Sequence, residues 1–294
     1  MTLEVELKLF INSVHEVPTE AMLMACWQPL LAKPVEVHPP KSLLNAYFET
    51  HDQWFRRHDC GLRTRLRSGR YEQTIKLAGQ QQGAAHIRPE YNQPCQSVTP
   101  ILADFPPEIW PPETDVSALQ QQLLEMFCTD FVRHSYGLTL HDGSVVEAVL
   151  DVGTVVAGQQ QSVICELELE LQQGNVQSLF TLARAMLADF ALSLGFLTKA
   201  ERGYRLAQQQ PLTWLNPPSG ASLADQLRAM QQNIWLQTDE PSRLQMQWQQ
   251  LQDALVTHAA PIALRQRAQS LVPSIAGDFQ LWLLDFSAWL LEDK

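Results

Sequence analysis

Residues 3–9 read Leu3-Glu4-Val5-Glu6-Leu7-Lys8-Leu9, in which apolar and charged side chains alternate without a break. Successive side chains of a β-strand point to opposite faces, so this alternation predicts a strand. One face carries the leucines and Val5, and the other carries Glu4, Glu6 and Lys8. Like charges two residues apart on one face repel each other unless a group of opposite charge lies between them.

The same alternation recurs along the chain, with the charges segregated by strand. Residues 61–67 place Arg63, Arg65 and Arg67 on one face, and residues 60–76 as a whole carry five basic side chains against one acidic side chain. Residues 165–171 place three carboxylates on one face, those of Glu166, Glu168 and Glu170. In the other strand-like segments the side chains that share a face are Thr74 with Lys76, Arg88 with Glu90, and Glu147 with Asp151, and Arg133 falls in a further segment.

Two interpretations fit this pattern. An antiparallel sheet with one face in water also alternates, but its wet face usually mixes both charge signs within a strand. Segregated charges favour an enclosed face on which carboxylates bind cations and arginines bind anions, and a polyanion with bound metal satisfies both sets. Metal-assisted phosphoryl transfer needs such oxygen ligands and cations. The sequence holds no Walker loop and no GxGxxG motif, so a glycine-rich phosphate loop is not the device.

The rest of the chain predicts more strands, followed by helices. Strands are expected at 42–50, 61–68, 70–78, 84–91, 127–136, 144–157 and 161–171, and helices at 18–31, 116–126 and 176–194. Residues 208–220 contain Pro211, Pro217 and Pro218 and are typical of a linker. We therefore expect a main domain at 1–206, a linker at 207–220 and a helical region at 221–294.

Composition narrows the class of protein. The net charge of −11 disfavours nucleic-acid binding. The five cysteines are odd in number and widely spaced, which fits a reducing cytoplasm better than a disulfide framework or a zinc site. No signal peptide and no stretch of about 18 apolar residues is evident, so we expect a cytoplasmic protein without a membrane partner.

Eight short motifs, in this order along the chain, resemble those of the CYTH superfamily, also called triphosphate tunnel metalloenzymes. The first is the ExExK of Glu4, Glu6 and Lys8, and the others follow up to residue 204. They are Tyr47-Phe48-Glu49-Thr50, Leu62-Arg63-Thr64-Arg65, Thr74-Ile75-Lys76, His86-Ile87-Arg88-Pro89-Glu90-Tyr91, Leu150-Asp151-Val152-Gly153, Glu166-Leu167-Glu168-Leu169-Glu170 and Thr198-Lys199-Ala200-Glu201-Arg202-Gly203-Tyr204.

The resemblance implies an α+β fold, with a closed eight-stranded antiparallel β-barrel that binds triphosphates, and helices outside it. It implies Mg²⁺ or Mn²⁺ as the cofactor, bound by Glu4, Glu6, Asp151, Glu166 and Glu168. It implies substrate contacts at Lys8, Arg63, Arg65, Lys76, Arg88, Arg133, Lys199 and Arg202. Lys8, Arg65 and Lys76 are the expected catalytic residues.

Three functions stay open at this level. The first is hydrolysis of inorganic triphosphate to pyrophosphate and phosphate, which the helical C-terminal region favours because longer bacterial members of the family carry a helical CHAD domain there. Residues 221–294 are too short and too acidic for a complete CHAD domain. The second function is a class IV-type adenylyl cyclase, or a nucleoside or thiamine triphosphatase, in the same tunnel. The third is a non-catalytic module that binds polyphosphate.

Overall fold

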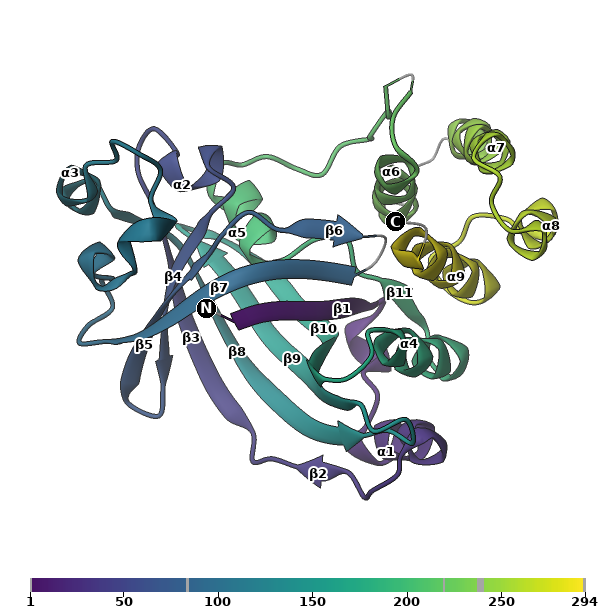
Figure 1. Ribbon diagram of the computed structural model, residues 1–294, viewed down its shortest axis with the longest axis horizontal. Coiled ribbons are helices and arrows are strands. Elements are labelled where there is room, and N and C mark those ends of the chain that lie inside the picture. Colours follow the sequence, from purple (N-terminus) through teal and green to yellow (C-terminus); the bar gives the residue numbers. More distant parts are fainter. Residues whose placement is uncertain (1, 83–84, 219, 237–240, 293–294) are drawn as a thin grey trace.

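The computed structural model describes residues 2–82, 85–218, 220–236 and 241–292. At its centre an antiparallel sheet curls into a closed barrel (Figure 1). Eight of the described strands form the ring in the order β1, β10, β9, β8, β3, β4, β5 and β7, and β7 pairs back onto β1. Their bounds are β1 Thr2–Ile11, β3 Lys41–Glu49, β4 Gly61–Arg67, β5 Arg70–Lys76, β7 Ala85–Cys95, β8 Leu124–Thr139, β9 Val145–Ala157 and β10 Gln160–Gln173. The predicted fold class is confirmed.

Strand β1 closes the barrel because it pairs with two strands at once. Its register places Glu6 opposite Glu170 of β10, and Glu4 opposite Arg88 of β7. Closure removes the unpaired strand edges of an open sheet. Three short strands extend the sheet: β2 Glu36–Val37, β6 Gln80–Gln82 and β11 Leu192–Leu194. Residue 84 of the strand predicted at 84–91 lies outside the described residues.

The alternation in sequence separates a polar inner face of the barrel from an apolar outer face. Leu7, Leu9, Leu167 and Leu169 are fully buried in one apolar cluster with the helices that cover the outside. Those helices include α1 Glu20–Trp27 and α4 Gln177–Asp189. Burial of this outer apolar surface stabilises the fold, so the inner face can carry charge.

Helix α9 Asp278–Glu292 joins the C-terminal helices to this outer face. The other three, α6 Leu223–Trp235, α7 Pro241–Thr257 and α8 Ile262–Ser270, pack on one another and on α9. Helix α9 lies against α4 and β11, and Leu194 N donates a hydrogen bond to Gln280 Oε1 at 2.9 Å. Trp282 and Phe286 belong to the same apolar cluster as Leu7. The division into 1–206, 207–220 and 221–294 stays a prediction, and residue 219 of the linker lies outside the described residues.

All three predicted helices are shorter in the structure. The one expected at 18–31 is α1 Glu20–Trp27, followed by a 3-10 turn at Gln28–Leu30. Helix α3 is Val116–Gln121, because β8 starts at Leu124 and its Glu125 pairs with Phe48 of β3. Helix α4 ends at Asp189, because Leu192 and Leu194 pair with β1 as strand β11. Apolar residues two apart fit a short strand as well as a helix.

Two further helices lie beside the barrel end. They are α2 Trp54–Arg57 and α5 Lys199–Ala207. The sequence pattern did not predict α5 as a helix, although its Thr198 accepts a hydrogen bond from Glu201 N as an N-cap. No helix within the described ranges is long and apolar enough to cross a membrane.

Candidate active site

The inside of the barrel holds a cavity of about 180 Å³. Among the described residues, seven cationic side chains line it: Lys8, Arg63, Arg65, Lys76, Arg88, Arg133 and Lys199. The carboxylates that line it in the described part of the chain are Glu4, Glu6, Glu90, Glu168 and Glu170. These groups come from six strands and helix α5. Because the cations outnumber the carboxylates, the cavity favours an anionic ligand.

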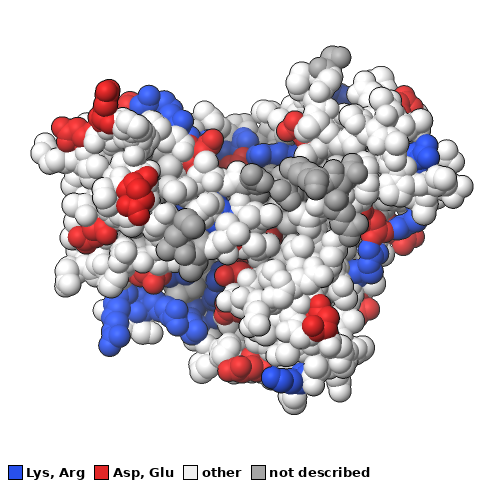
Figure 2. Space-filling model, in the orientation of Figure 1, with Lys and Arg blue, Asp and Glu red and all other residues white. Residues whose placement is uncertain are grey.

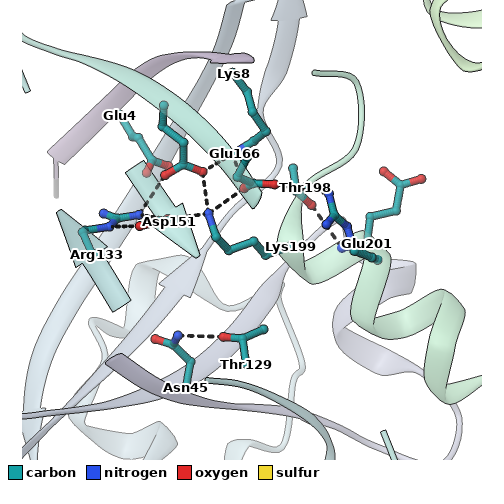
Figure 3. Close-up of polar contacts among 12 residues, drawn as sticks. Glu4, Lys8, Asn45, Thr129, Arg133, Asp151, Glu166, Thr198, Lys199 and Glu201 are labelled. Atoms are coloured by element: carbon teal, nitrogen blue, oxygen red, sulfur yellow. Dashed lines mark hydrogen bonds and ion pairs between the residues drawn. The ribbon is translucent and has the colours of Figure 1, made fainter. Parts of the chain in front are cut away.

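Two lysines hold the carboxylates of β10. Lys8 Nζ lies 3.1 Å from Glu166 Oε1 and also pairs with Glu168. Lys199 Nζ lies 2.6 Å from Glu166 Oε1 and 2.9 Å from Glu168 Oε1. Figure 3 shows Lys8 and Lys199 approaching Glu166 from β1 and from the start of α5. The N-cap of α5 therefore positions one of the two ammonium groups at this site.

Arg133 of β8 fixes the neighbouring carboxylates by a two-point ion pair. Its Nε and Nη2 donate to the two oxygens of Asp151 at 2.8 and 2.7 Å (Figure 3). The same Nη2 also donates to Glu168 Oε2 at 2.8 Å. Lys199 Nζ lies 2.7 Å from Asp151 Oδ2. Asp151 is fully buried, so these contacts replace its hydration.

The ion pairs keep the buried carboxylates charged. Burial opposes their ionisation, but Lys199 and Lys8 hold the pKa of Glu166 below its usual value and that of Glu168 well below it. Against the same effect of burial, Lys199 and Arg133 lower the pKa of Asp151. Burial also opposes the charge of Lys8, but Glu166 and Glu168 raise its pKa well above the usual value.

Strand β4 contributes Arg63 and Arg65 to the cavity wall and no carboxylate. Arg65 Nε donates to Asn45 Oδ1 at 2.7 Å, and Arg63 lies opposite Tyr47 in the β3–β4 register. Burial, together with the charges of Arg63 and Arg133, lowers the pKa of Arg65 to about 9. The Nε of Arg63 is buried without a hydrogen-bond partner in the part of the chain that the structure describes. A bound anion would favour the charged form of Arg65 and would accept a hydrogen bond from Arg63 Nε.

The wall formed by β1 and β10 carries an excess of negative charge. Glu6 and Glu170 face each other across the strand pair, where like charges repel. Burial and the charge of Glu4 raise the pKa of Glu170 to about 7, and burial raises the pKa of Glu6. Lys76 compensates part of this charge by pairing with Glu4 and by lying 3.4 Å from Glu90. A bound cation would offset the remaining repulsion between these carboxylates.

A family model described as the CYTH domain matches residues 2–204. The chain belongs to the CYTH family. This match covers well over half of the chain and ends within α5, so it includes every wall of the barrel. The resemblance inferred from the motifs is therefore confirmed.

Known relatives of the CYTH chain include an inorganic triphosphatase of Haemophilus influenzae. It is 34% identical over 185 residues, which are 61% of this chain and 50% of that protein, so this chain spans about half the length of that relative. Among solved structures, the chain is similar to HpAC1 from Hippeastrum, which is described as having a dominant triphosphatase activity. The two are 14% identical with a TM-score of 0.39, and the match covers 63% of this chain and 86% of HpAC1. The inorganic triphosphatase NE1496 is 18% identical with a TM-score of 0.25, covering 60% of this chain and 80% of its own.

The CYTH barrel brings most of the predicted site residues to one cavity. The residues on its wall are Glu4, Glu6, Lys8, Arg63, Arg65, Lys76, Arg88, Arg133, Glu168 and Lys199. Asp151, Glu166 and Arg202 are not on that wall, and they lie behind it in ion pairs, with Arg202 Nη2 3.2 Å from Glu166 Oε2. Within residues 2–82, 85–218, 220–236 and 241–292, no group of three or more Asp, Glu, His or Cys side chains is arranged to hold a metal ion. The roles assigned to all these residues stay predictions.

Nine residues on the cavity wall were not among the predicted site residues. They are Asn45, Tyr47, Gly61, His86, Glu90, Phe131, Glu170, Thr198 and Ala200. Glu170 and His86 each lie two residues from a predicted site residue, on the same face of its strand, so a stricter use of alternation finds them. Asn45 and Tyr47 alternate in the same way along β3, but neutral side chains give no charge signal.

We expect the metal-free CYTH barrel to lose stability in acid. The pKa values of Asp151, Glu166 and Glu168 are lowered by folding, so their contribution is fully present above the unfolded values of about 4 and is lost as the pH falls below them. The measurement is the free energy of unfolding from urea titrations with a chelator, between pH 7 and pH 3. A free energy of unfolding that stays constant from pH 6 to pH 3 would contradict this account of the ion pairs.

Proposed function

We propose that this CYTH chain hydrolyses inorganic triphosphate to pyrophosphate and phosphate. The observation that carries the proposal is the cavity in the closed barrel, which is cationic on one wall and rich in carboxylates on the other. A polyphosphate needs cations along its length, and cleavage of its anhydride bond needs preorganised charge around the transferred phosphoryl group. The inorganic triphosphatase relative supports the same substrate.

Cationic side chains of the cavity are the proposed contacts of the substrate. Arg63 and Arg65 suit this role because a guanidinium donates two parallel hydrogen bonds to a phosphate. The full proposed set is Lys8, Arg63, Arg65, Lys76, Arg88, Arg133 and Lys199, with Arg202 acting from behind through Glu166. Of these, Lys8, Arg65 and Lys76 are the proposed catalytic residues, since they offset the charge that develops during transfer.

We propose Mg²⁺ or Mn²⁺ as the cofactor at the carboxylate wall. Both ions prefer oxygen ligands, and the repulsion between Glu6 and Glu170 across the β1–β10 pair supports a cation at this wall. The proposed ligands are Glu4, Glu6, Glu166 and Glu168, with Asp151 close by, and Glu170 joins this candidate set. When bound, the ion would supply Lewis-acid polarisation of a phosphoryl oxygen.

Lys8 and Lys199 link the metal and substrate proposals. Both ammonium groups contact carboxylate oxygens for which a divalent cation competes. If a divalent cation took these oxygens, the two lysines would be available to donate to substrate phosphates. A water oxygen forms the new bond to the terminal phosphorus, and the anhydride P–O bond breaks with its electron pair on the pyrophosphate oxygen. One proton of the water stays on the new orthophosphate and the other passes to a product oxygen or to solvent, while Arg63 and Arg65 stabilise the charge of the leaving pyrophosphate. The barrel limits bulk water and so strengthens each charge interaction.

The lining of the barrel cavity favours an inorganic substrate over a nucleotide. It is mostly charged, whereas a nucleobase needs an apolar or stacking surface. Tyr47 and Phe131 are the aromatic residues on the wall within the described ranges.

We expect phosphate release from tripolyphosphate to exceed release from ATP and thiamine triphosphate by at least about tenfold in kcat/KM, a difference of about 1.4 kcal/mol. The assay compares the three substrates with Mg²⁺ and with Mn²⁺ and also measures cyclic AMP from ATP. Faster turnover of ATP, or cyclic AMP as the main product, would select the nucleotide functions instead. Tight binding of tripolyphosphate without turnover would select the non-catalytic module.

A further inference from the structure

A second chamber lies at one end of the barrel and reaches the C-terminal helices. Its volume is about 430 Å³, and its wall includes residues of α2, α5 and α6. It shares Gly61, His86, Arg88, Thr198 and Ala200 with the barrel cavity, so the two spaces adjoin. Figure 2 shows charged side chains in the hollow between the barrel and the C-terminal helices. A ligand in the barrel can therefore extend toward α6.

Three arginines on the wall of the second chamber come from separate parts of the chain. Arg56 of α2 stacks over the ring of Tyr204 at 4.6 Å, and its Nη1 is buried without a partner among the described residues. Arg88 of β7 is held by the carbonyl of Asp59, to which its Nη2 donates at 2.8 Å. Arg228 of α6 completes the set. Asp59 and Glu201 also lie on this wall, so the three guanidinium groups outnumber the carboxylates there and favour an anion with several oxygens.

Arg228 can bind such an anion without leaving a carboxylate unpaired. Its Nη2 lies 3.2 Å from Glu201 Oε1, and Arg205 Nη2 lies 3.3 Å from the same oxygen. Glu201 would therefore keep Arg205 as its partner if Arg228 turned to a ligand. The side chain of Arg228 is 40% exposed, so this movement displaces no packed core.

His86 marks the boundary between the two spaces. Its Nε2 is buried and has no hydrogen-bond partner in the described part of the protein. Burial and the charges of Lys8 and Arg228 lower the pKa of His86 to about 4, so the ring is neutral at pH 7 and adds no charge. A neutral, unpartnered imidazole at this boundary can hydrogen-bond to a ligand that passes from one space to the other.

We propose that the second chamber binds the outer phosphate of an inorganic polyphosphate with four or more phosphates, with Arg56, Arg88 and Arg228 as its cationic contacts. The proposal rests on the proposed function, because it takes the inner phosphates to lie in the barrel cavity. Since the two spaces adjoin, the next phosphate of the same chain is the anion best placed to reach these arginines. The C-terminal region then contributes to substrate length selection through Arg228.

Calorimetric binding in chelator-containing buffer tests this proposal without requiring turnover. The probes are tripolyphosphate and tetrapolyphosphate. The proteins are the wild type, Arg228→Gln and the matched control Arg243→Gln. In the native protein Arg243 of α7 places its guanidinium over the ring of Trp214 at 4.5 Å. We expect the wild type to bind tetrapolyphosphate about tenfold more tightly than tripolyphosphate, since one charge-assisted phosphate contact is added. Arg228→Gln should remove this preference and leave tripolyphosphate affinity within about twofold, while Arg243→Gln keeps it.

Equal affinity of the wild type for both probes would overturn the proposal, and so would an equal loss for both probes in Arg228→Gln. Thermal melts of the three proteins establish that each is folded. A preference for tetrapolyphosphate in a protein that releases no phosphate from tripolyphosphate would contradict the proposed function but support the second anion site. Hydrolysis of tripolyphosphate without a preference for tetrapolyphosphate would support the proposed function but contradict the second anion site.

Discussion

We expect Arg65→Ala to lower kcat/KM for tripolyphosphate by about 10²–10³, equivalent to about 3–4 kcal/mol of transition-state stabilisation. The Arg65 side chain lies on the cavity wall, where its Nε donates a hydrogen bond to Asn45 Oδ1 that orients the guanidinium. Burial and the charges of Arg63 and Arg133 already disfavour its charge, so a phosphate there gains a strongly favourable partner. The measurement is steady-state phosphate release at saturating metal, with a thermal melt for each protein.

Two further variants make the Arg65 result specific. Arg65→Lys should restore part of the lost activity, because an ammonium keeps the charge but not the two-point geometry. Arg70→Ala removes an arginine that is exposed at the end of the β4–β5 pair, and it should stay within about threefold of the wild type. If Arg65→Ala stays within about threefold as well, the β4 wall does not bind the substrate.

Glu6→Gln should reduce hydrolysis of tripolyphosphate to the background rate. Glu6 lines the cavity and faces Glu170 across the β1–β10 pair, where we place the divalent cation. The amide is nearly isosteric with the carboxylate but is a much weaker ligand for a hard cation. Removing a buried charge of like sign should not destabilise the barrel, so the free energy of unfolding should be unchanged or higher.

Metal binding can be followed separately from activity for Glu6→Gln. The thermal melting temperature of the wild type should rise on addition of Mn²⁺, and this rise should shrink in the variant, since a ligand that binds the folded state stabilises it. Glu125→Gln, at an exposed position of β8, serves as the matched control. Near wild-type turnover by Glu6→Gln at saturating metal would show that Glu6 is not a ligand.

The charge pattern of the sequence is local and repetitive, so it predicted which side chains share a strand face, while the closed barrel was predicted from the resemblance to the CYTH superfamily. Alternation in residues 3–9 and 165–171 states which side chains share a face, and closure of the sheet brings those faces together. The alternation and the resemblance together assigned Glu4 and Lys76, which lie 72 residues apart, to one site before any contact was known. The short strand β11 and the full length of β8 were missed, because runs of two or three apolar residues fit a helix equally well.

The sequence could not predict which charges would neutralise one another. Glu166 and Glu168 are equivalent by alternation, yet Glu166 lies behind the cavity wall and Glu168 is on it. Lys199 of α5 contacts both carboxylates, whereas Arg202 of α5 pairs with Glu166, and the position of α5 depends on tertiary packing. The approach of Arg228 from α6 to the barrel end has the same origin.

Phosphorus NMR of the reaction tests the central claim most directly, because it observes the substrate and both products at once. With tripolyphosphate and Mg²⁺ or Mn²⁺, we expect the tripolyphosphate signals to fall while orthophosphate and pyrophosphate appear in equal amounts, and Arg65→Ala should slow this conversion in proportion to its kcat/KM. Tripolyphosphate signals that stay unchanged over hours with either metal and a folded wild-type protein would contradict hydrolysis in the charged barrel.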